Sequence, residues 1–300
     1  MSRIILLGAE GQVGWELQRA LAPLGQLTIA TRQDADLSST AALHHWVMQE
    51  RPSIIVNAAA YTAVDKAETD EAAARLINAE AVATLANCAT LLDARLVHYS
   101  TDYVFNGQGS TPFTEEDKPA PLNAYGRTKL AGEQAIRESG CAHLIFRTSW
   151  VYAARGSNFM RAILRLAKER SALNVVADQI GAPTSAELIA DVTALALGQV
   201  RGNRANTRSG TYHLTAGGAV SWHQFAQFIV EEARSLGLAL ELETERIRPI
   251  PSSEYPLPAT RPANSSLNTE KLRSDFNLYL PDWQHHARRT LKELIESGTA

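Results

Sequence analysis

The sequence is poor in cysteine and in long apolar runs, and both shortages exclude whole classes of protein. Its 300 residues include two cysteines, Cys88 and Cys141, and neither belongs to a Cys-x-x-Cys pair. Metal fingers and thioredoxin-like motifs are therefore excluded, and we expect two reduced, packed thiols. No apolar run approaches the ~20 residues that a membrane span needs. The first apolar segment, Ile4–Gly8, is too short for a signal peptide, so we expect a cytoplasmic protein.

The chain also lacks an excess of one charge. It has 29 Lys and Arg against 32 Asp and Glu, which gives a net charge of −3, and both signs are spread along the sequence. Because there is no basic stripe and no polybasic run, we expect neither a nucleic-acid partner nor a membrane partner. Internal repeats and low-complexity segments are absent as well. What remains is the composition of a soluble globular protein, 45% hydrophobic and 20% charged.

The first half of the chain alternates short apolar runs with longer amphipathic ones. The apolar runs do not alternate with polar residues, so they predict strands that are covered on both faces. Strands are predicted at Arg3–Leu7, Leu27–Ala30, Ile54–Asn57, Leu96–Tyr99 and His143–Arg147, and helices at Gln12–Leu24, Thr40–Gln49, Glu71–Leu92 and Ala124–Glu138. This alternation predicts an α/β fold with a doubly wound, parallel Rossmann-type sheet.

The rhythm changes after Arg147. Helices are predicted at Asn158–Arg170, Ser185–Gly198, Ser221–Leu236 and Trp283–Ser297, strands at Leu173–Val176 and Thr211–Leu214, and a loop at Arg201–Gly210. The proline-rich stretch Pro249–Pro262 cannot form a regular helix or central strand, and we expect it to wrap over a site or partner. We predict an NAD(P)-binding Rossmann domain at 1–150 plus roughly 172–200, and a smaller, partly interleaved substrate-binding domain at 151–171 and 201–300.

A glycine-rich turn joins the first predicted strand to the first predicted helix. Gly8, Gly11 and Gly14 give it the spacing Gly-x-x-Gly-x-x-Gly. The first glycine permits a tight turn, the second lets the backbone approach a pyrophosphate, and the third lets helix and strand pack closely. The start of the helix then offers free N–H groups to the phosphates. The turn predicts a bound dinucleotide, and the alternative is a βα turn with no ligand.

The end of the second predicted strand bears on which dinucleotide is bound. An NAD site usually has an acidic residue here for the ribose 2′-hydroxyl. This chain has Arg32, which could face a 2′-phosphate, but Asp34 and Asp36 follow closely. The sequence therefore favours NADPH and leaves NADH open. A solvated surface arginine is the alternative for Arg32.

Tyr125 and Lys129 are four residues apart, which places them on one face of a helix. A tyrosine has a pKa of about 10, and a nearby ammonium favours the phenolate and lowers that pKa. Of the eight tyrosines, only Tyr125 has a lysine four residues later. Thr101 follows the fourth predicted strand at its carboxyl end, where open α/β sheets bind ligands. We predict that these three residues are catalytic and serve proton transfer at a carbonyl during hydride transfer.

Together these features resemble the extended short-chain dehydrogenase/reductase family. Several segments are similar to its dTDP-4-dehydrorhamnose reductase branch, over essentially the whole chain: Gly8–Leu17, Asn57–Glu68, Ser100–Phe105, Arg147–Tyr152, Gly181–Thr184, Arg261–Ser265 and Leu280–Trp283. The branch implies NAD(P)H-dependent reduction of the C4 ketone of dTDP-4-dehydro-6-deoxy-L-mannose to dTDP-L-rhamnose, the last step in making this precursor of lipopolysaccharide and cell-wall polysaccharide. Related dehydratases carry an Asp-Glu pair after the threonine, whereas Asp102-Tyr103 follows Thr101 here.

The resemblance also implies roles for individual residues. Lys129 would tune Tyr125 and hold the nicotinamide ribose, and Thr101 would orient the ketone. With the glycine turn and Arg32 included, the predicted cofactor contacts are Gly8, Gly11, Gln12, Val13, Gly14, Arg32, Asp36, Leu37, Ala60, Tyr61, Thr62, Tyr99, Tyr125 and Lys129. The predicted contacts to the dTDP-sugar substrate are Val64, Asp65, Thr101, Asp102, Tyr103, Trp150 and Arg261. Trp150 could instead be a core aromatic, and Arg261 could instead form a surface ion pair.

Some members of this branch form a dimer that Mg²⁺ bridges through glutamates. Glu16, Glu187 and Glu293 match those positions in motif context, and carboxylate oxygens suit that ion. The resemblance therefore implies a homodimer with a structural Mg²⁺ that has no role in hydride transfer. Spacing alone would assign the three glutamates to solvated helix faces.

Two other functions remain open. A nucleotide-sugar 4-epimerase of the same superfamily would keep NAD bound through turnover. A non-catalytic, dinucleotide-binding regulatory subunit would keep the fold while acting on a partner enzyme. The complete set Thr101, Tyr125 and Lys129 argues against a pure binder, which would not need all three.

Overall fold

A parallel sheet of six strands forms the centre of the molecule. The structure is a computed structural model and describes residues 2–200 and 208–300. Its strands are ordered β10-β5-β4-β3-β1-β2, and all five pairings are parallel. They are β1 (Arg3–Leu7), β2 (Gln26–Ala30), β3 (Ile54–Asn57), β4 (Arg95–Thr101), β5 (Ala142–Thr148) and β10 (Gly210–His213). The five strands predicted in the first half are confirmed. The order changes direction between β1 and β3, where sheets of this kind bind ligands.

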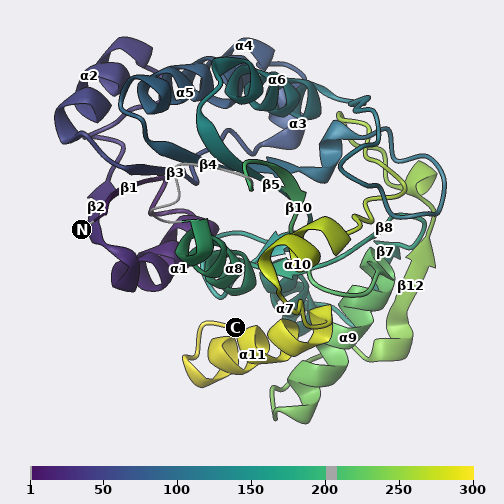
Figure 1. Cartoon of the computed structure of the whole chain (residues 1–300). Helices are drawn as coiled ribbons and strands as arrows, with labels where there is room; N and C mark the ends of the chain where they lie inside the picture. The colour runs from purple at the N-terminus through teal and green to yellow at the C-terminus, as the bar shows by residue number, and fades with distance from the viewer. Residues whose placement is uncertain (1, 201–207) are drawn as a thin grey trace.

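Helices cover both faces of this sheet, as Figure 1 shows: α2, α5 and α6 lie on one side, and α1 and α8 lie on the other. Their bounds are α1 (Gln12–Leu21), α2 (Thr40–Glu50), α5 (Ala81–Leu91), α6 (Ala124–Ser139) and α8 (Ala186–Val200). Every residue of β3 and β4 is buried, as the unalternating apolar runs predicted. The doubly wound, Rossmann-type α/β fold is therefore confirmed.

The helix predicted over Glu71–Leu92 is interrupted. After the short helix α3 (Val64–Ala67), the chain forms α4 (Glu71–Arg75), a π-helical turn at Leu76–Glu80, and then α5. Here α6 approaches closely, because a Cβ at Gly132 would lie 2.2 Å from the carbonyl oxygen of Asn78. Single π turns inside helices often occur at functional sites. The prediction of one regular helix was wrong at this point.

The second half forms a smaller region of helices and two-stranded sheets. Its helices are α7 (Phe159–Glu169), α9 (Trp222–Ser235), α10 (Glu270–Phe276) and α11 (Trp283–Glu296). Its short strands β6 (Val151–Tyr152), β7 (Leu173–Val176), β8 (Ile180–Gly181), β9 (Thr184–Ser185), β11 (Val220–Ser221) and β12 (Ile247–Ile250) pair as β6-β9, β7-β12 and β8-β11. Turns of 3₁₀ helix lie at Ala22–Leu24, Asp102–Val104, Thr244–Arg246 and Ser252–Glu254.

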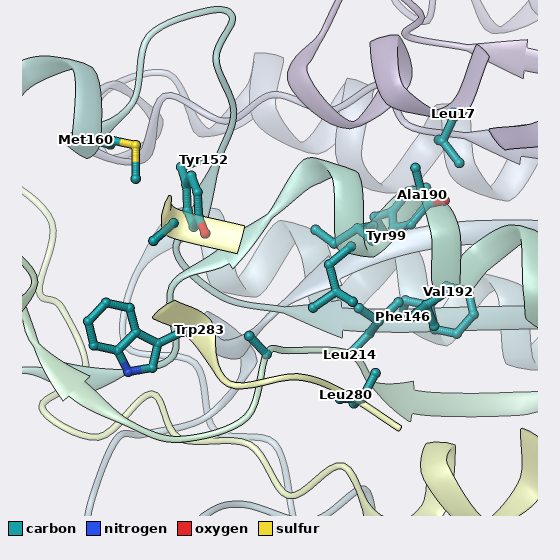
Figure 2. Close-up of a cluster of buried hydrophobic side chains, with 14 of the residues drawn as sticks. Leu17, Tyr99, Phe146, Tyr152, Met160, Ala190, Val192, Leu214, Leu280 and Trp283 are labelled. Atoms are coloured by element: carbon teal, nitrogen blue, oxygen red, sulfur yellow. The ribbon is translucent and has the colours of Figure 1, made fainter. Parts of the chain in front are cut away.

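One apolar core connects the two halves. Figure 2 shows side chains of the sheet, Tyr99 and Phe146, beside Ala190 and Val192 of α8, with Trp283 of the last helix in the same view. All five belong to one cluster of buried side chains. The sheet, α8 and the carboxyl-terminal helices are thus packed around shared apolar side chains.

The division into two domains stays a prediction. Strand β10, from the range 201–300, completes the main sheet beside β5, and β7, from the range 172–200, pairs with β12. Residues 201–207 of the predicted loop lie outside the described residues. Within the described ranges, no helix has both the length and the apolarity that crossing a membrane requires. Cys88 and Cys141 are free and buried.

Candidate functional site

The turn between β1 and α1 has no room for side chains at two of its glycines. Gly8 has a φ of +75°, and a Cβ there would lie 2.4 Å from the backbone nitrogen of Ala59. A Cβ at Gly14 would lie 2.0 Å from the carbonyl oxygen of Gly8. Gly11 is the N-cap of α1, and no side chain caps the first N–H groups of the helix. A bare, N–H-rich turn at this edge of the sheet fits the pyrophosphate of a dinucleotide.

A segment from the second half lies against this turn. Asn158 donates from Nδ2 to Oε1 of Gln12, 2.8 Å away, and to the carbonyl oxygen of Ala153. The Arg155 guanidinium lies over the ring of Trp15 at 3.5 Å from its centroid. Val13 packs against the apolar core. Asn158 therefore orients a predicted cofactor residue, a contact that sequence spacing does not reveal.

The residues after β2 form a polar surface. Arg32 is largely exposed, with its Nε 3.6 Å from Oδ2 of Asp36. The pKa of Asp36 is lowered, chiefly because the Ser38 backbone N–H donates to its carboxylate. Leu37 is buried. Arg32 thus forms a surface ion pair, which does not decide between NADPH and NADH.

The segment after β3 is held by the π turn. Asn78 accepts from the backbone N–H of Tyr61 at 2.9 Å and donates to its carbonyl oxygen at 3.0 Å. The same amide donates to the Thr128 hydroxyl on α6. The Tyr61 backbone, and with it the segment Ala60–Thr62, is therefore fixed directly after Ala59, which contacts Gly8.

Tyr125 lies in the first turn of α6. The side chain of Asn123 caps this helix by accepting from the N–H of Gly126 at 2.8 Å. The Tyr103 ring meets the Tyr125 ring edge-on, with centroids 5.6 Å apart. The Thr101 hydroxyl donates to Asp102 Oδ1 at 3.1 Å and accepts from the Tyr103 N–H at 3.2 Å. The structure thus brings β4's end and the start of α6 together as predicted.

The pKa of Tyr125 moves opposite to the sequence expectation. Burial raises this pKa to about 12, the Asp102 carboxylate raises it further, and the Thr101 hydroxyl opposes the shift. Lys129 is not among the groups that shift this pKa, so the lowering expected from Lys129 stays a prediction. A phenol with this pKa keeps its proton at neutral pH and is available as an acid.

Lys129 is buried, and its side-chain nitrogen is turned toward β4. Its Nζ lies 2.6 Å from the carbonyl oxygen of Tyr99 and 3.1 Å from Nε2 of His98. Burial lowers the pKa of Lys129 to about 8, and the Glu133 carboxylate opposes this. The Tyr99 hydroxyl is paired with Thr193 of α8 at 2.9 Å, and its ring packs in the core (Figure 2). The Tyr99 backbone, rather than its ring, therefore contacts Lys129 of the predicted catalytic set.

Two acidic residues stand on the predicted substrate side. Asp102 is buried, and burial raises its pKa to about 6 while the Thr101 hydroxyl opposes the shift. Asp65, next to Val64 at the start of α3, accepts both guanidinium arms of Arg261, at 2.9 and 2.8 Å. The Ala259 N–H donates to the same carboxylate. The proline-rich stretch thus crosses this end of the site, and the ion-pair alternative for Arg261 is what the structure shows.

Trp150 belongs to an aromatic stack. It has a φ of +47°, and its ring lies parallel to that of Trp222 with centroids 3.4 Å apart. A Cβ at Gly181 would lie 2.6 Å from the Trp150 ring. The side chain is half-buried at the edge of the core, so the core alternative and the substrate-facing prediction are compatible.

The three predicted metal ligands lie near one another. The pKa of Glu16 is raised, first by burial and also by the carboxylates of Glu187 and Glu293. Glu187 forms two hydrogen bonds to Arg289, at 2.7 and 3.1 Å. In the part of the chain that the structure describes, no group of three or more acidic, His or Cys side chains could hold a metal ion. The residues as they stand do not fit a bound Mg²⁺.

Comparisons with a family profile, with curated proteins and with solved structures agree on one family. The profile of the family described as RmlD substrate binding domain matches residues 2–296. A dTDP-4-dehydrorhamnose reductase of Shigella flexneri is 52% identical over 296 residues, covering 97% of this chain and 98% of the relative. That of Salmonella typhimurium (strain LT2) is 50% identical over 300 residues, covering 99% of each. The crystal structure of the Bacillus anthracis dTDP-4-dehydrorhamnose reductase in complex with NADP has a TM-score of 0.87 and 34% identity, covering 97% of this chain and 99% of that chain.

Proposed function

Because this chain belongs to the family described as RmlD substrate binding domain, we propose that it is a dTDP-4-dehydrorhamnose reductase. It reduces the C4 ketone of dTDP-4-dehydrorhamnose with NADPH and yields dTDP-L-rhamnose. The observation that carries this proposal is the sequence identity of 50–52% to curated dTDP-4-dehydrorhamnose reductases over nearly the full chain. Neither a 4-epimerase nor a regulatory subunit has a specific observation in its favour.

The chain's own residues would hold the dinucleotide at the β1 turn. Backbone N–H groups of Gln12 and Val13 would bind the pyrophosphate, and the Tyr61 segment would flank the other side. When bound, the nicotinamide supplies the hydride. The NADP complex of the Bacillus anthracis relative supports NADPH as the cofactor, and NADH stays open.

Tyr125 is the proposed proton donor. Its O–H bond breaks as an O–H bond forms at the substrate oxygen, so the product gains one hydride and one proton. The pKa of about 12 keeps the phenol protonated beforehand. Thr101 would orient the ketone, and Lys129 would hold the ribose and return a proton toward Tyr125.

The substrate end would be formed by the predicted contacts Val64, Asp65, Asp102, Tyr103, Trp150 and Arg261. Arg261 is held by Asp65, so a substrate diphosphate would have to share or replace this carboxylate as its partner.

A homodimer and a cytoplasmic location are proposed from the resemblance alone. A Mg²⁺ held by Glu16, Glu187 and Glu293 would require Glu187 to leave Arg289. Light scattering of the purified protein with EDTA and then with excess MgCl₂ tests the homodimer and the metal. A dimer that forms only with MgCl₂ supports a bridging Mg²⁺, whereas a dimer of equal stability in EDTA contradicts it.

The function is tested by adding the protein to enzymatically generated dTDP-4-dehydrorhamnose and following NADPH absorbance, then NADH absorbance. Substrate-dependent oxidation, with dTDP-L-rhamnose as the product, is expected. Cofactor binding without oxidation would contradict the proposal and would point to an epimerase or a binding subunit.

A further inference from the structure

A buried chain of side chains lies behind Lys129. Asn57 ends β3, and His98 stands directly opposite it on β4. Asn57 Nδ2 is 3.2 Å from His98 Nδ1, and His98 Nε2 is 3.1 Å from Lys129 Nζ. All three residues are 1% exposed. Water therefore does not compete for these hydrogen bonds, and each polar atom depends on its protein partner.

The orientation of Asn57 determines which nitrogen of His98 carries a proton. The Ala59 N–H donates to Asn57 Oδ1 at 3.1 Å, and a backbone N–H can only donate. The Asn57 amide nitrogen therefore faces His98 and donates to Nδ1, which must be unprotonated. Burial lowers the pKa of His98 well below its usual value, so its ring is neutral. A neutral ring with a bare Nδ1 carries its proton on Nε2.

This proton points at Lys129. A charged ammonium has three N–H groups and no lone pair, so it cannot accept from Nε2–H. A neutral amine has a lone pair for that proton and still donates to the Tyr99 carbonyl oxygen, 2.6 Å away. Each of these four contacts, from Ala59 to Tyr99, pairs a donor with an acceptor only when Lys129 is neutral.

We propose that His98, oriented by Asn57, is a positioning residue that stabilises the neutral amine of Lys129. This inference rests on the proposed function. After Tyr125 gives its proton to the substrate oxygen, an N–H bond of Lys129 breaks as that proton passes toward the phenolate. The amine that remains is the form that His98 satisfies, and a proton from solvent restores the ammonium.

The charged surroundings of Lys129 are consistent with this role. Burial lowers the pKa of Lys129 to about 8, while Glu133, one turn later on α6, opposes the shift. Glu133 is itself bound by Arg147 of β5 through two hydrogen bonds, at 2.9 and 2.6 Å. Its charge is therefore largely balanced by Arg147. His98 on β4 is the titratable side chain in direct contact with the Lys129 nitrogen.

The substitution Asn57→Asp tests the proposal. One carboxylate oxygen would accept from Ala59 and the other from Nδ1–H of His98, which would move the ring proton from Nε2 to Nδ1. Nitrogen-15 NMR of the histidine rings and carbon-13 NMR of the lysine Cε groups report the two states in protein without added cofactor. We expect Nε2–H in the wild type and Nδ1–H in the variant, with the Lys129 titration midpoint raised by about one pH unit. A wild-type Nδ1–H ring, or equal Lys129 midpoints, would overturn the proposal.

Two further variants keep the test decisive. Asn78→Asp makes the same change at another 1% exposed asparagine, which faces Tyr61 and Thr128, and should leave the His98 proton on Nε2. If Asn57→Asp does not fold, His98→Gln offers Lys129 an amide oxygen and should raise the same midpoint. Because the NMR readout needs no turnover, its failure is distinct from a failure of the reductase assay.

Discussion

The two ends of the site are built differently. The centre of the cofactor end is the glycine turn, and its shape is set by backbone that leaves no room at Gly8 and Gly14. The substrate end is assembled from side chains far apart in sequence, such as Asp65 and Arg261, which are 196 residues apart. The first end should therefore tolerate changes of charge but no added Cβ atom. The second should tolerate changes of size, whereas loss of Arg261 should weaken the binding of substrate.

The largest effect is expected where the two ends meet, at Tyr125. Tyr125→Phe removes the proposed proton donor but keeps the ring that packs against Tyr103. General acid catalysis contributes about 10²- to 10⁴-fold, so kcat should fall by that factor. Affinity for NADPH, measured by fluorescence titration, should change little, because the glycine turn that is proposed to bind the pyrophosphate is unchanged. Wild-type turnover in this variant would show that another group donates the proton.

At the substrate end, the pH dependence of folding stability tests the buried state of Asp102. Its pKa is raised to about 6, so between about pH 4 and pH 6 the folded protein binds more protons than the unfolded chain. Folding stability therefore falls as pH rises through this window, and the full penalty is present above pH 6. Asn cannot ionise, so the stability of Asp102→Asn relative to the wild type should increase by about 2 kcal/mol from pH 4.5 to pH 7.5.

Urea denaturation of both proteins at the two pH values measures this difference. Asp117 supplies the matched control, because its carboxylate is exposed and its pKa is lowered by the Thr114 backbone and hydroxyl. The lowered pKa confines the titration of Asp117 to below about pH 4, so Asp117→Asn should show almost no change in stability relative to the wild type between these two pH values. An equal and parallel response of the two variants would contradict the buried, proton-retaining state of Asp102.

Gly14→Ala tests the cofactor end. The new Cβ would meet the Gly8 carbonyl oxygen at 2.0 Å, so the turn must shift. Overpacking of this kind costs about 1–3 kcal/mol, and NADPH affinity should fall at least about tenfold.

Gly198→Ala is the matched control, because its new Cβ in helix α8 would have no atom within 4 Å apart from the backbone of its own helix. That variant should be about 0.5–1 kcal/mol more stable, with unchanged NADPH affinity. Normal NADPH binding by Gly14→Ala would mean that the turn is not the pyrophosphate site.

The same contrast explains what the sequence could predict. The five strands of the first half, the glycine turn and the shared helix face of Tyr125 and Lys129 follow from local spacing, which fixes backbone geometry and side-chain direction. Local spacing does not reveal which distant residues pack against a given face of a helix or strand. The Asp65–Arg261 pair, the Trp150–Trp222 stack and the His98 contact of Lys129 therefore went unforeseen.

The raised pKa of Tyr125 has the same cause. Its largest contribution is burial, which comes from packing across the whole site rather than from the lysine one turn away. The π turn at Leu76–Glu80 was missed because an apolar helical pattern does not distinguish one π turn within it. Roles assigned to single residues remain predictions, since spacing and packing place side chains without showing what they bind.

The smallest effect is expected for the stability of the Asp65–Arg261 pair. The Asp65 side chain is 37% exposed and that of Arg261 is 19% exposed, so solvent screens the attraction. A double-mutant cycle with Asp65→Asn and Arg261→Gln should give a coupling energy below about 1 kcal/mol.

The exposed Arg273–Glu270 pair on α10 is the control and should give a similarly small value, with an unchanged KM for the dTDP-sugar. Arg261→Gln, in contrast, should raise that KM several-fold, because the guanidinium is proposed to bind the substrate diphosphate. A coupling energy above about 2 kcal/mol with an unchanged KM would make the pair a structural clamp and would remove Arg261 from the substrate end.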